Sequence, residues 1–388
     1  MPALDGLKVL EAGLLIQGPQ CTALLHDWGA EVVKVELPGL GDQARWLPVQ
    51  PGDGRSAFFT ACNRGKRSVG LDLRNPAGRA TFLRLAEWAD VVVSNFAPGT
   101  MEAWGLSYDD VVAVNPRVIY AVGSTFGHRG PDAAREGADL AAQAAGGLIA
   151  GTGRDGDSVT PLAITITDHI AAQNLVAGIL AALLVRERTG RGQRIETSLL
   201  GGQVWAQASE LTGHLLTGLP HGRANRGHPL IPGVYAIFTT ADGAIAIVGV
   251  VGALRERFYE LIGRPELAAR FPQTLYWDAD KAELFPLIDE AMQARTTAEW
   301  ADLLAGAGMR FAPVRNLAEL PGNEQVWAND YLTSVGGTTV VATPVRFSET
   351  PARASADVPE VGQHTEEVLL EIGLTWDDIG ELREQQAI

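Results

Sequence analysis

Residues 8–36 read KVLEAGLLIQGPQCTALLHDWGAEVVKVE, and this stretch contains the pattern that decides the fold. A short apolar strand over 8–10 is followed by glycines, by a helical stretch over 20–28 and by a valine-rich strand over 31–35. Pro19 lies near the start of the helix and Gly29 just past its end, where these residue types are favoured. The stretch therefore predicts one βαβ unit with parallel strands.

The same alternation continues through the first half of the chain. Further strands are expected over 67–71, 90–94, 118–122 and 194–198, and helices over 77–88, 108–114, 139–150 and 168–188. This order predicts an α/β domain with a mostly parallel sheet. The helix over 168–188 is apolar on all sides, which predicts a position inside that domain.

The composition changes after about residue 216. Two strands, over 234–241 and 244–250, are joined by Asp242-Gly243 and predict a hairpin. Helices are expected from 254 to about 307, then a connector rich in glycine, proline and threonine over 313–359, and helical segments over 366–373 and 377–386. At 388 residues, the chain is long enough for two domains.

Charge and composition exclude several classes of protein. The chain has 31 basic and 46 acidic residues and a net charge of −15, which argues against a nucleic acid partner. Two cysteines exclude a disulfide framework and a cysteine-rich zinc site. No signal peptide pattern is visible, and the longest apolar run, 175–185, is about half the roughly 20 residues of a membrane span. We expect a cytoplasmic protein without a membrane partner.

Asp168 opens the long apolar helix and allows two interpretations. Aspartate is a favoured N-cap residue, so a structural role alone would explain it. The second interpretation is a carboxylate nucleophile. In that case, the free N–H groups and the positive end of the helix dipole would keep Asp168 ionised near neutral pH.

The remaining patterns are less specific. The segment 151–156 matches G-x-G-x-x-G, but an expected helix precedes it where a dinucleotide site requires a strand. Gly13, Gly18 and Glu36, which follows the second strand, resemble the residues of a dinucleotide site, but the two glycines have the wrong spacing. The seven histidines form no metal or hydrolase motif. The basic cluster over 64–67, with Arg74, is either a solvated turn or a set of phosphate contacts.

The chain resembles the class III CoA-transferases, a family that includes formyl-CoA transferase, carnitine CoA-transferase and the bile-acid-inducible F group. The resemblance extends over nearly the whole sequence. It rests on the segments 4–10, 18–19, 29–36, 38–42, 63–69, 71–72, 95–99, 115–119, 189–193 and 362–369.

The resemblance implies that Asp168 is the nucleophile and that coenzyme A moves from an acyl-CoA donor to a free carboxylic acid through a covalent aspartyl intermediate. Acyl-CoA would then be a substrate, with no tightly bound cofactor and no metal. The resemblance also implies coenzyme A contacts at Gln17, Leu71, Arg74, Asn95 and Phe96.

The implied fold is an interlocked homodimer. Its Rossmann-like large domain would cover 1–200 and 345–388, and its smaller α+β domain would cover 225–320. The segments 201–224 and 321–344 would be linkers.

Some positions depart from the family pattern. Leu37, Ala97 and Ala103 stand where relatives often carry basic residues for the nucleotide phosphates. Candidates to replace those residues are Arg45, Arg64, Lys66 and Arg74.

Three different functions stay open beside CoA transfer. In the related acyl-CoA racemases, a histidine in a Gly-His-Asp segment acts with the same aspartate, and here that segment is Gly137-Ala138-Asp139. Without the imidazole, proton exchange at an α-carbon lacks one of its two bases. The second function is that of a non-catalytic subunit of a heteromeric transferase, which the presence of Asp168 disfavours. The third is that of a nicotinamide-dependent oxidoreductase.

Overall fold

The computed structural model of the protein describes residues 1–47, 54–272 and 278–388. The chain divides into two compact units. The first unit consists of Met1–Gly146, Ala163–Ala206 and Asn323–Ile388, and the second of Gly147–Leu162 and Gln207–Gly322. The segment 147–162, which the sequence assigns to the large domain, is joined to the second unit by backbone hydrogen bonds. The amides of Ala224 and Asn225 donate to the carbonyls of Gly151 and Gly153, each at 2.8 Å.

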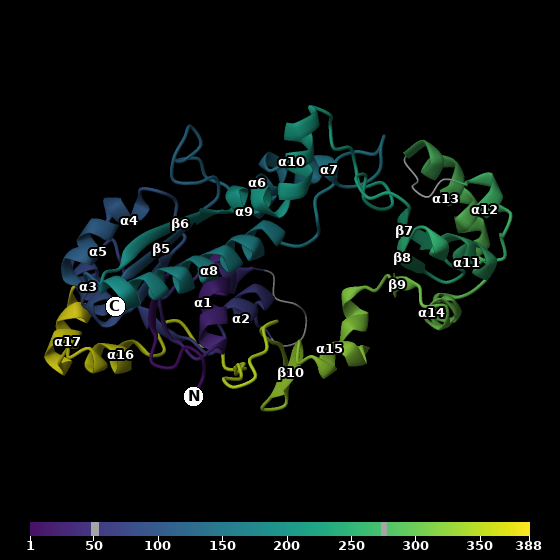
Figure 1. The fold of residues 1–388 in the computed structure, drawn as a ribbon. Coiled ribbons are helices and arrows are strands. Elements are labelled where there is room, and N and C mark those ends of the chain that lie inside the picture. Colours follow the sequence, from purple (N-terminus) through teal and green to yellow (C-terminus); the bar gives the residue numbers. More distant parts are fainter. Residues whose placement is uncertain (48–53, 273–277) are drawn as a thin grey trace. The chain divides into compact units, whose positions relative to one another are not determined.

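The first unit is built on a six-stranded sheet in which all neighbouring strands are parallel. Its strand order, β3-β2-β1-β4-β5-β6, is that of a doubly wound Rossmann fold, and Figure 1 shows the sheet at the centre of this unit. The expected α/β class is therefore confirmed. The strands are β1 (Lys8–Ala12), β2 (Glu31–Glu36), β3 (Arg67–Gly70), β4 (Val91–Ser94), β5 (Ile119–Ser124) and β6 (Gln193–Ser198).

Helices cover both faces of this sheet, which explains its nearly continuous apolar strands. In β4, Val91 and Val93 pack in one core with the helices α1 and α8, while Val92 packs in another with α3 and α5. The helices of this part are α1 (Gln17–Asp27), α2 (Ala57–Asn63), α3 (Pro76–Trp88), α4 (Thr100–Ala103), α5 (Tyr108–Val114), α6 (Asp139–Ala145), α8 (Ile166–Thr189) and α9 (Leu199–Ala206), with a 3-10 turn η1 at Gln43–Trp46.

The long helix α8 is only partly enclosed by the chain. Its inner side, including Ala172 and Ile179, packs against α1 and the sheet. Leu184 and Val185 are exposed, so the expectation of a helix buried on all sides is wrong for the single chain. By length and composition, α8 could cross a membrane, and a third of its most apolar window is buried. Its packing on the sheet identifies it as a core helix of the first unit.

The second unit has its own core around a three-stranded antiparallel sheet. The predicted hairpin is present, with Asp242-Gly243 between its strands. Helices pack over the sheet, and Trp300, Phe258 and Phe238 are buried among them. The elements of this unit are α7 (Leu148–Gly151), α10 (Ala208–Thr217), β7 (Val234–Thr239), β8 (Ala244–Val250), α11 (Ala253–Leu261), α12 (Leu267–Arg270), α13 (Asp278–Met292), α14 (Thr297–Gly306), β9 (Arg310–Pro313) and η2 (Leu317–Gly322).

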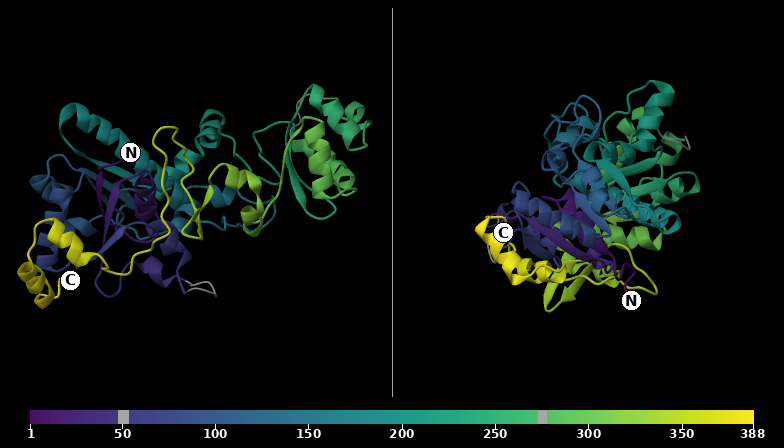
Figure 2. Two further views of the ribbon diagram at one scale, coloured as in Figure 1. Left: turned by 90° about the horizontal axis from the view of Figure 1, so that it is seen from below. Right: turned by 90° about the vertical axis from the view of Figure 1, so that its left-hand side faces the viewer.

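The C-terminal segment returns to the first unit, so both ends of the chain lie there (Figure 2). It joins the edge strand β3, where the His364 amide donates to the carbonyl of Ser68 at 2.9 Å and the Gly70 amide donates to Thr365 Oγ1 at 2.9 Å. The expected linker over 321–344 contains a short helix and a hairpin of its own. The elements here are α15 (Glu324–Ala328), β10 (Leu332–Val335), β11 (Thr338–Val341), α16 (Thr365–Glu371) and α17 (Trp376–Glu384).

The helix expected over 139–150 is divided in two. α6 ends at Ala145, and α7 starts at Leu148. Gly147 between them has a φ of 86°, in the left-handed region that glycine adopts without strain. At the other end of α6, Asp139 packs closely against the first turn of α8.

Candidate active site

Asp168 lies in the first turn of α8 but does not cap that helix. The N-cap position belongs to Thr165, and no side chain caps the helix there. Asp168 is half-buried. Its carboxylate accepts no hydrogen bond from the part of the chain that the structure describes. The N-cap interpretation is therefore wrong, and the carboxylate oxygens are available for chemistry.

A second carboxylate, Asp139, takes the donors that Asp168 lacks. Asp139 is buried at the start of α6 and accepts hydrogen bonds from the amide of Thr167 at 2.7 Å, from Thr167 Oγ1 at 2.6 Å and from the amide of Asp168 at 3.3 Å. Gln143 Nε2 donates to its other oxygen at 2.6 Å. These bonds fix the first turn of α8 and thereby the backbone of Asp168.

This arrangement makes Asp168 a weaker acid than a free aspartate. Burial, followed by the negative charge of Asp139, raises the pKa of Asp168 from 3.8 to about 7. The sequence predicts the opposite, because the helix N-terminus was expected to keep Asp168 ionised. The physical reason is that burial and the charge of Asp139 disfavour the ionised form, while the amides of Thr167 and Asp168 donate to Asp139 instead. The neighbouring His169 does not supply a positive charge, because burial lowers the pKa of its imidazole.

A pocket of about 380 Å³ opens in the first unit at the carboxyl ends of β2 and β3. Ligands of open parallel sheets bind at this edge. Leu71, Arg74 and Phe96, three of the five predicted coenzyme A contacts, line this pocket. Its lining also includes Leu14, Val35, Glu36, Leu37, Leu40, Gly41, Gln43, Trp46, Asp72, Leu73 and Trp104. We refer to this site as the sheet-edge pocket.

The other two predicted contacts, Gln17 and Asn95, do not line this pocket but shape the turn between β1 and α1. Asn95 accepts a hydrogen bond from the Leu14 amide at 2.8 Å and donates to the Leu14 carbonyl at 2.9 Å. A Cβ atom on Gly13 would lie 2.8 Å from Asn95 Oδ1, so that glycine is needed for this contact. Gln17 is buried and donates to the Ser124 carbonyl at 3.5 Å. Asn95 and Gln17 thus hold the turn in place.

Glu36 does not have the free carboxylate that binds the ribose in a nicotinamide site. This residue is buried, and its carboxylate accepts hydrogen bonds from Arg45 at 2.7 and 2.9 Å, from Ser68 at 2.5 Å and from the Asp42 amide at 2.9 Å. Its oxygens are therefore occupied and do not face a ribose. The segment 151–156 also lacks the required context, because the short helix α7 precedes it.

The basic cluster forms internal ion pairs instead of a phosphate site. Lys66 is buried and donates to Glu11 at 2.7 Å, and Lys34 donates to the same carboxylate at 2.6 Å. Burial alone would raise the pKa of Glu11, but the two lysines lower it to about 2. Arg64 is buried and binds Asp27 through two bonds of 2.5 and 2.8 Å. Arg64, Lys66 and Arg45 are therefore each paired with a carboxylate of the protein, and the hypothesis that one of them holds phosphates stays a prediction.

Comparisons with known proteins agree with this geometry. The sequence model of CoA-transferase family III matches residues 4–365. The chain belongs to CoA-transferase family III. It is 35% identical to succinyl-CoA:mesaconate CoA-transferase of Haloarcula hispanica, over 96% of this chain and 97% of that protein. It is 33% identical to human succinyl-CoA:glutarate CoA-transferase, over 98% of this chain and 88% of that protein.

The fold of this family III enzyme matches a solved structure as well. A CAIB/BAIF family protein from Brucella suis superposes with a TM-score of 0.87 and 32% identity, covering 96% of this chain and 99% of that one. Enzymes of family III use coenzyme A thioesters as substrates. Within the described residues, no group of three or more histidine, cysteine or acidic side chains could hold a metal ion.

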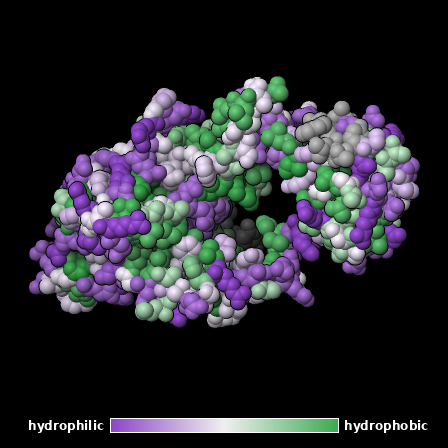
Figure 3. All heavy atoms as spheres, in the orientation of Figure 1, coloured by the Kyte–Doolittle hydropathy of each residue, from purple (hydrophilic) through white to green (hydrophobic). Residues whose placement is uncertain are grey.

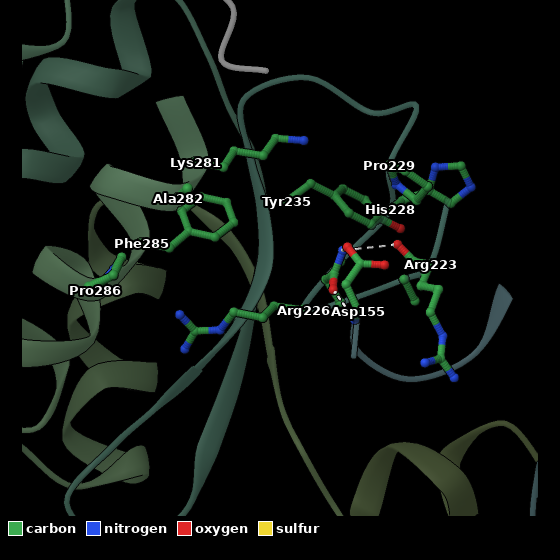
Figure 4. Close-up of a pocket in the computed structure, with 13 residues that line it drawn as sticks. Asp155, Arg223, Arg226, His228, Pro229, Tyr235, Lys281, Ala282, Phe285 and Pro286 are labelled. Carbon is green, nitrogen blue, oxygen red and sulfur yellow. Dashed lines mark hydrogen bonds between the residues drawn. The ribbon is translucent and has the colours of Figure 1, made fainter. Parts of the chain in front are cut away.

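A second pocket of this family III enzyme lies within the second unit and has a volume of about 360 Å³ (Figure 4). Its lining contains Arg223, Arg226 and Lys281, but both arginines are engaged by other groups of the protein. Arg226 forms an ion pair with Asp289. Arg223 donates to the carbonyls of Thr152, Arg154 and Asp157 and so holds the segment 147–162 in place.

Sequence reasoning missed Asp139 and the two tryptophans of the sheet-edge pocket. Asp139 is 29 residues before Asp168, and only the packing of α6 on α8 joins them. Trp46 follows a turn in which Asp42 accepts a hydrogen bond from the Ala44 amide. The sequence of this turn alone gives no indication that the indole lines a pocket.

Proposed function

We propose that this enzyme transfers coenzyme A from an acyl-CoA to a free carboxylic acid, with Asp168 as the covalent nucleophile. The observation that carries the proposal is the half-buried carboxylate of Asp168, to which none of the described residues donates a hydrogen bond, while a second carboxylate anchors the same turn. A structural aspartate would use its oxygens as acceptors, as Asp139 does.

The proposed reaction has four balanced steps. A carboxylate oxygen of Asp168 attacks the thioester carbon of the donor, the C–S bond breaks, and a mixed anhydride and a coenzyme A thiolate result. The thiolate then attacks the aspartyl carbonyl and releases the donor acid, which leaves an aspartyl-CoA thioester. The acceptor carboxylate attacks this thioester, forming a second anhydride and freeing the thiolate. The thiolate finally attacks the acceptor's acyl carbon and regenerates Asp168.

This sequence of steps requires that water stay away from Asp168, because anhydrides hydrolyse. The surroundings of α6 in the first unit support this requirement, since Ala142, Ala171 and Leu199 are buried together beside Asp139. For the acids, we propose small dicarboxylates, because the relatives from Haloarcula hispanica and from humans are named for mesaconate and glutarate. For the nucleotide end of coenzyme A, we propose the sheet-edge pocket.

The test is to trap the intermediate. The enzyme is incubated with succinyl-CoA alone, treated with hydroxylamine and digested, and the peptide that contains Asp168 is weighed. A hydroxamate at Asp168 is expected, because hydroxylamine attacks an aspartyl thioester but not a carboxylate. An unmodified peptide after incubation with each member of an acyl-CoA panel, under conditions in which transfer is observed, would exclude the covalent route.

A racemase reaction predicts a different isotope result. Ala138 precedes α6 at the position where racemases carry a histidine, so that segment supplies no imidazole to act with Asp168. We expect no deuterium to enter the α-carbon of 2-methylacyl-CoA in D₂O during many transfer turnovers. Rapid deuterium incorporation, measured by mass spectrometry, would favour the racemase reaction.

We also propose that two copies of the chain form the interlocked homodimer of the family. Support comes from large apolar side chains that are exposed on two helices. Trp205 on α9 and Leu215 and Leu216 on α10 are each more than 70% exposed. Figure 3 shows hydrophobic residues gathered over α10. Such large exposed side chains are typical of an interface.

Interlocking predicts that subunits cannot exchange while they stay folded. When tagged and untagged dimers are mixed, we expect no mixed dimers in a pull-down after days. Mixed dimers should appear after joint unfolding and refolding. Exchange within minutes under native conditions would contradict the interlocked arrangement and favour an ordinary dimer.

A further inference from the structure

The sheet-edge pocket carries very little positive charge. Of its lining residues that the structure describes, Arg74 alone is a cation, and the lining also contains the acids Glu36 and Asp72. Phosphate groups are held in proteins mainly by arginine, by lysine and by free backbone N–H groups.

Arg74 is already bound within the pocket's own rim. Its guanidinium donates to both oxygens of Asp72, at 2.9 and 2.8 Å, and its amide donates to the same carboxylate at 2.9 Å. This two-point contact is the geometry by which arginine otherwise holds a phosphate. Arg45, which precedes the lining residue Trp46 in the sequence, makes the same kind of contact with Glu36. Both arginines are therefore paired with carboxylates of the same unit, Arg74 at the surface and Arg45 with the buried Glu36.

Backbone donors around the pocket are also committed. α3 starts next to Arg74 with Pro76, which has no N–H, and the Ala77 amide donates to the Asn75 side chain. Among the lining residues, amides that donate to protein acceptors are those of Leu14, Leu40, Gly41, Leu71, Asp72, Arg74, Phe96 and Trp104. Most of the backbone amides that line the described part of the pocket are therefore already bound to protein acceptors.

The pocket offers apolar and aromatic surface instead. Trp46 is 69% exposed, and its indole is fixed because Nε1 donates to the Leu40 carbonyl at 2.9 Å. Phe96 and Trp104 form an edge-to-face pair with ring centroids 5.1 Å apart. Flat aromatic rings stack well on a purine base, whatever charges the attached ribose carries.

We propose that this enzyme recognises the adenine of its thioester substrate but not the 3′-phosphate, so that thioesters of dephospho-coenzyme A are substrates equivalent to those of coenzyme A. The inference rests on the proposed function, because it places the adenosine end in the sheet-edge pocket. A 3′-phosphate on that ribose would lie at the rim, where Arg74 is held by Asp72.

The test compares kcat/KM for succinyl-CoA and for succinyl-dephospho-CoA with the same acceptor acid. We expect the two values to agree within about threefold. A phosphate bound by a charged partner contributes about tenfold or more, so a preference of that size for succinyl-CoA would overturn the inference. If a second copy of the chain supplied a cation that binds the 3′-phosphate, succinyl-CoA would be preferred to the same extent, and the inference would also be overturned.

The outcome separates this inference from the proposed function. If succinyl-CoA is a substrate and its dephospho form is not, only the inference fails. If no thioester of coenzyme A in an acyl-CoA panel supports transfer to any acid tested, the proposed function itself fails.

Two variants test whether the sheet-edge pocket is the site that recognises the adenosine end of the thioester. Trp46→Ala should raise KM for both thioesters by the same factor, because it removes stacking surface and no charge. Arg74→Ala should leave the ratio of the two kcat/KM values unchanged. The opposite result would be that Arg74→Ala lowers kcat/KM for succinyl-CoA at least fivefold more than for its dephospho form. In that case Arg74 leaves Asp72 to hold the phosphate, and the inference is wrong.

Discussion

Asp168→Asn is expected to abolish transfer of coenzyme A, lowering kcat by a factor of about 10³ or more. The amide has nearly the same shape as the carboxylate but no nucleophilic oxygen, so the first anhydride cannot form. Transfer is measured from succinyl-CoA to a dicarboxylic acid by following both thioesters with chromatography. The hydroxamate on the Asp168 peptide should disappear in the same variant.

A measurement of the stability of this variant tests whether misfolding is the cause. An acid whose pKa is higher in the folded protein destabilises the fold as pH rises from its unfolded value to its folded value. For Asp168 that window runs from 3.8 to about 7. At pH 8, the free energy of unfolding of Asp168→Asn should therefore exceed that of the wild type, by no more than about 4 kcal/mol, and the difference should vanish near pH 4.

A matched control comes from the other end of the same helix. Glu187 is exposed near the end of α8. Glu187→Gln also removes one carboxylate charge, and we expect it to retain full activity and ordinary stability. An Asp168→Asn protein that is stable at pH 8 and still transfers coenzyme A at more than a few per cent of the wild-type rate would refute the nucleophilic role.

The fold of the first unit was largely predictable because its signals are local. A short run of apolar residues predicts a strand such as Val91–Ser94, and two adjacent residues predict the Asp242-Gly243 turn of the second unit. Asp168 was also predictable as a candidate, because its place at the start of α8 follows from the helical pattern. The resemblance to the family, and not the helix, indicated its chemistry.

The roles of the charged residues were not predictable in the same way. Lys66 looks like a solvated lysine or a phosphate ligand, and only the fold places it in the core against Glu11. The pKa of Asp168 likewise depends on Asp139, which packs beside it through a separate helix. An ion pair or a repulsion between distant segments is a property of packing, which a local pattern does not contain.

Asp139→Asn is expected to move the acidic limb of the pH–rate profile to lower pH. The nucleophile reacts as the carboxylate, so kcat/KM should rise with pH through about 7 in the wild type. The amide that this substitution introduces can still accept the hydrogen bond from the Thr167 amide, but it carries no charge. The pKa of Asp168 then falls toward 3.8, although burial keeps it above that value.

The expected readout is the shape of the profile and not only the rate. At about pH 5.5, the activity of Asp139→Asn relative to its own maximum should exceed that of the wild type by roughly tenfold, because a larger share of Asp168 is ionised. Thr167→Val is the matched control, since it removes the 2.6 Å hydrogen bond to Asp139 without changing charge. The Thr167→Val protein should be less stable than the wild type, but the acidic limb of its pH–rate profile should stay at the wild-type pH. An acidic limb that stays in place in Asp139→Asn would mean that Asp139 anchors the turn without controlling the protonation of Asp168.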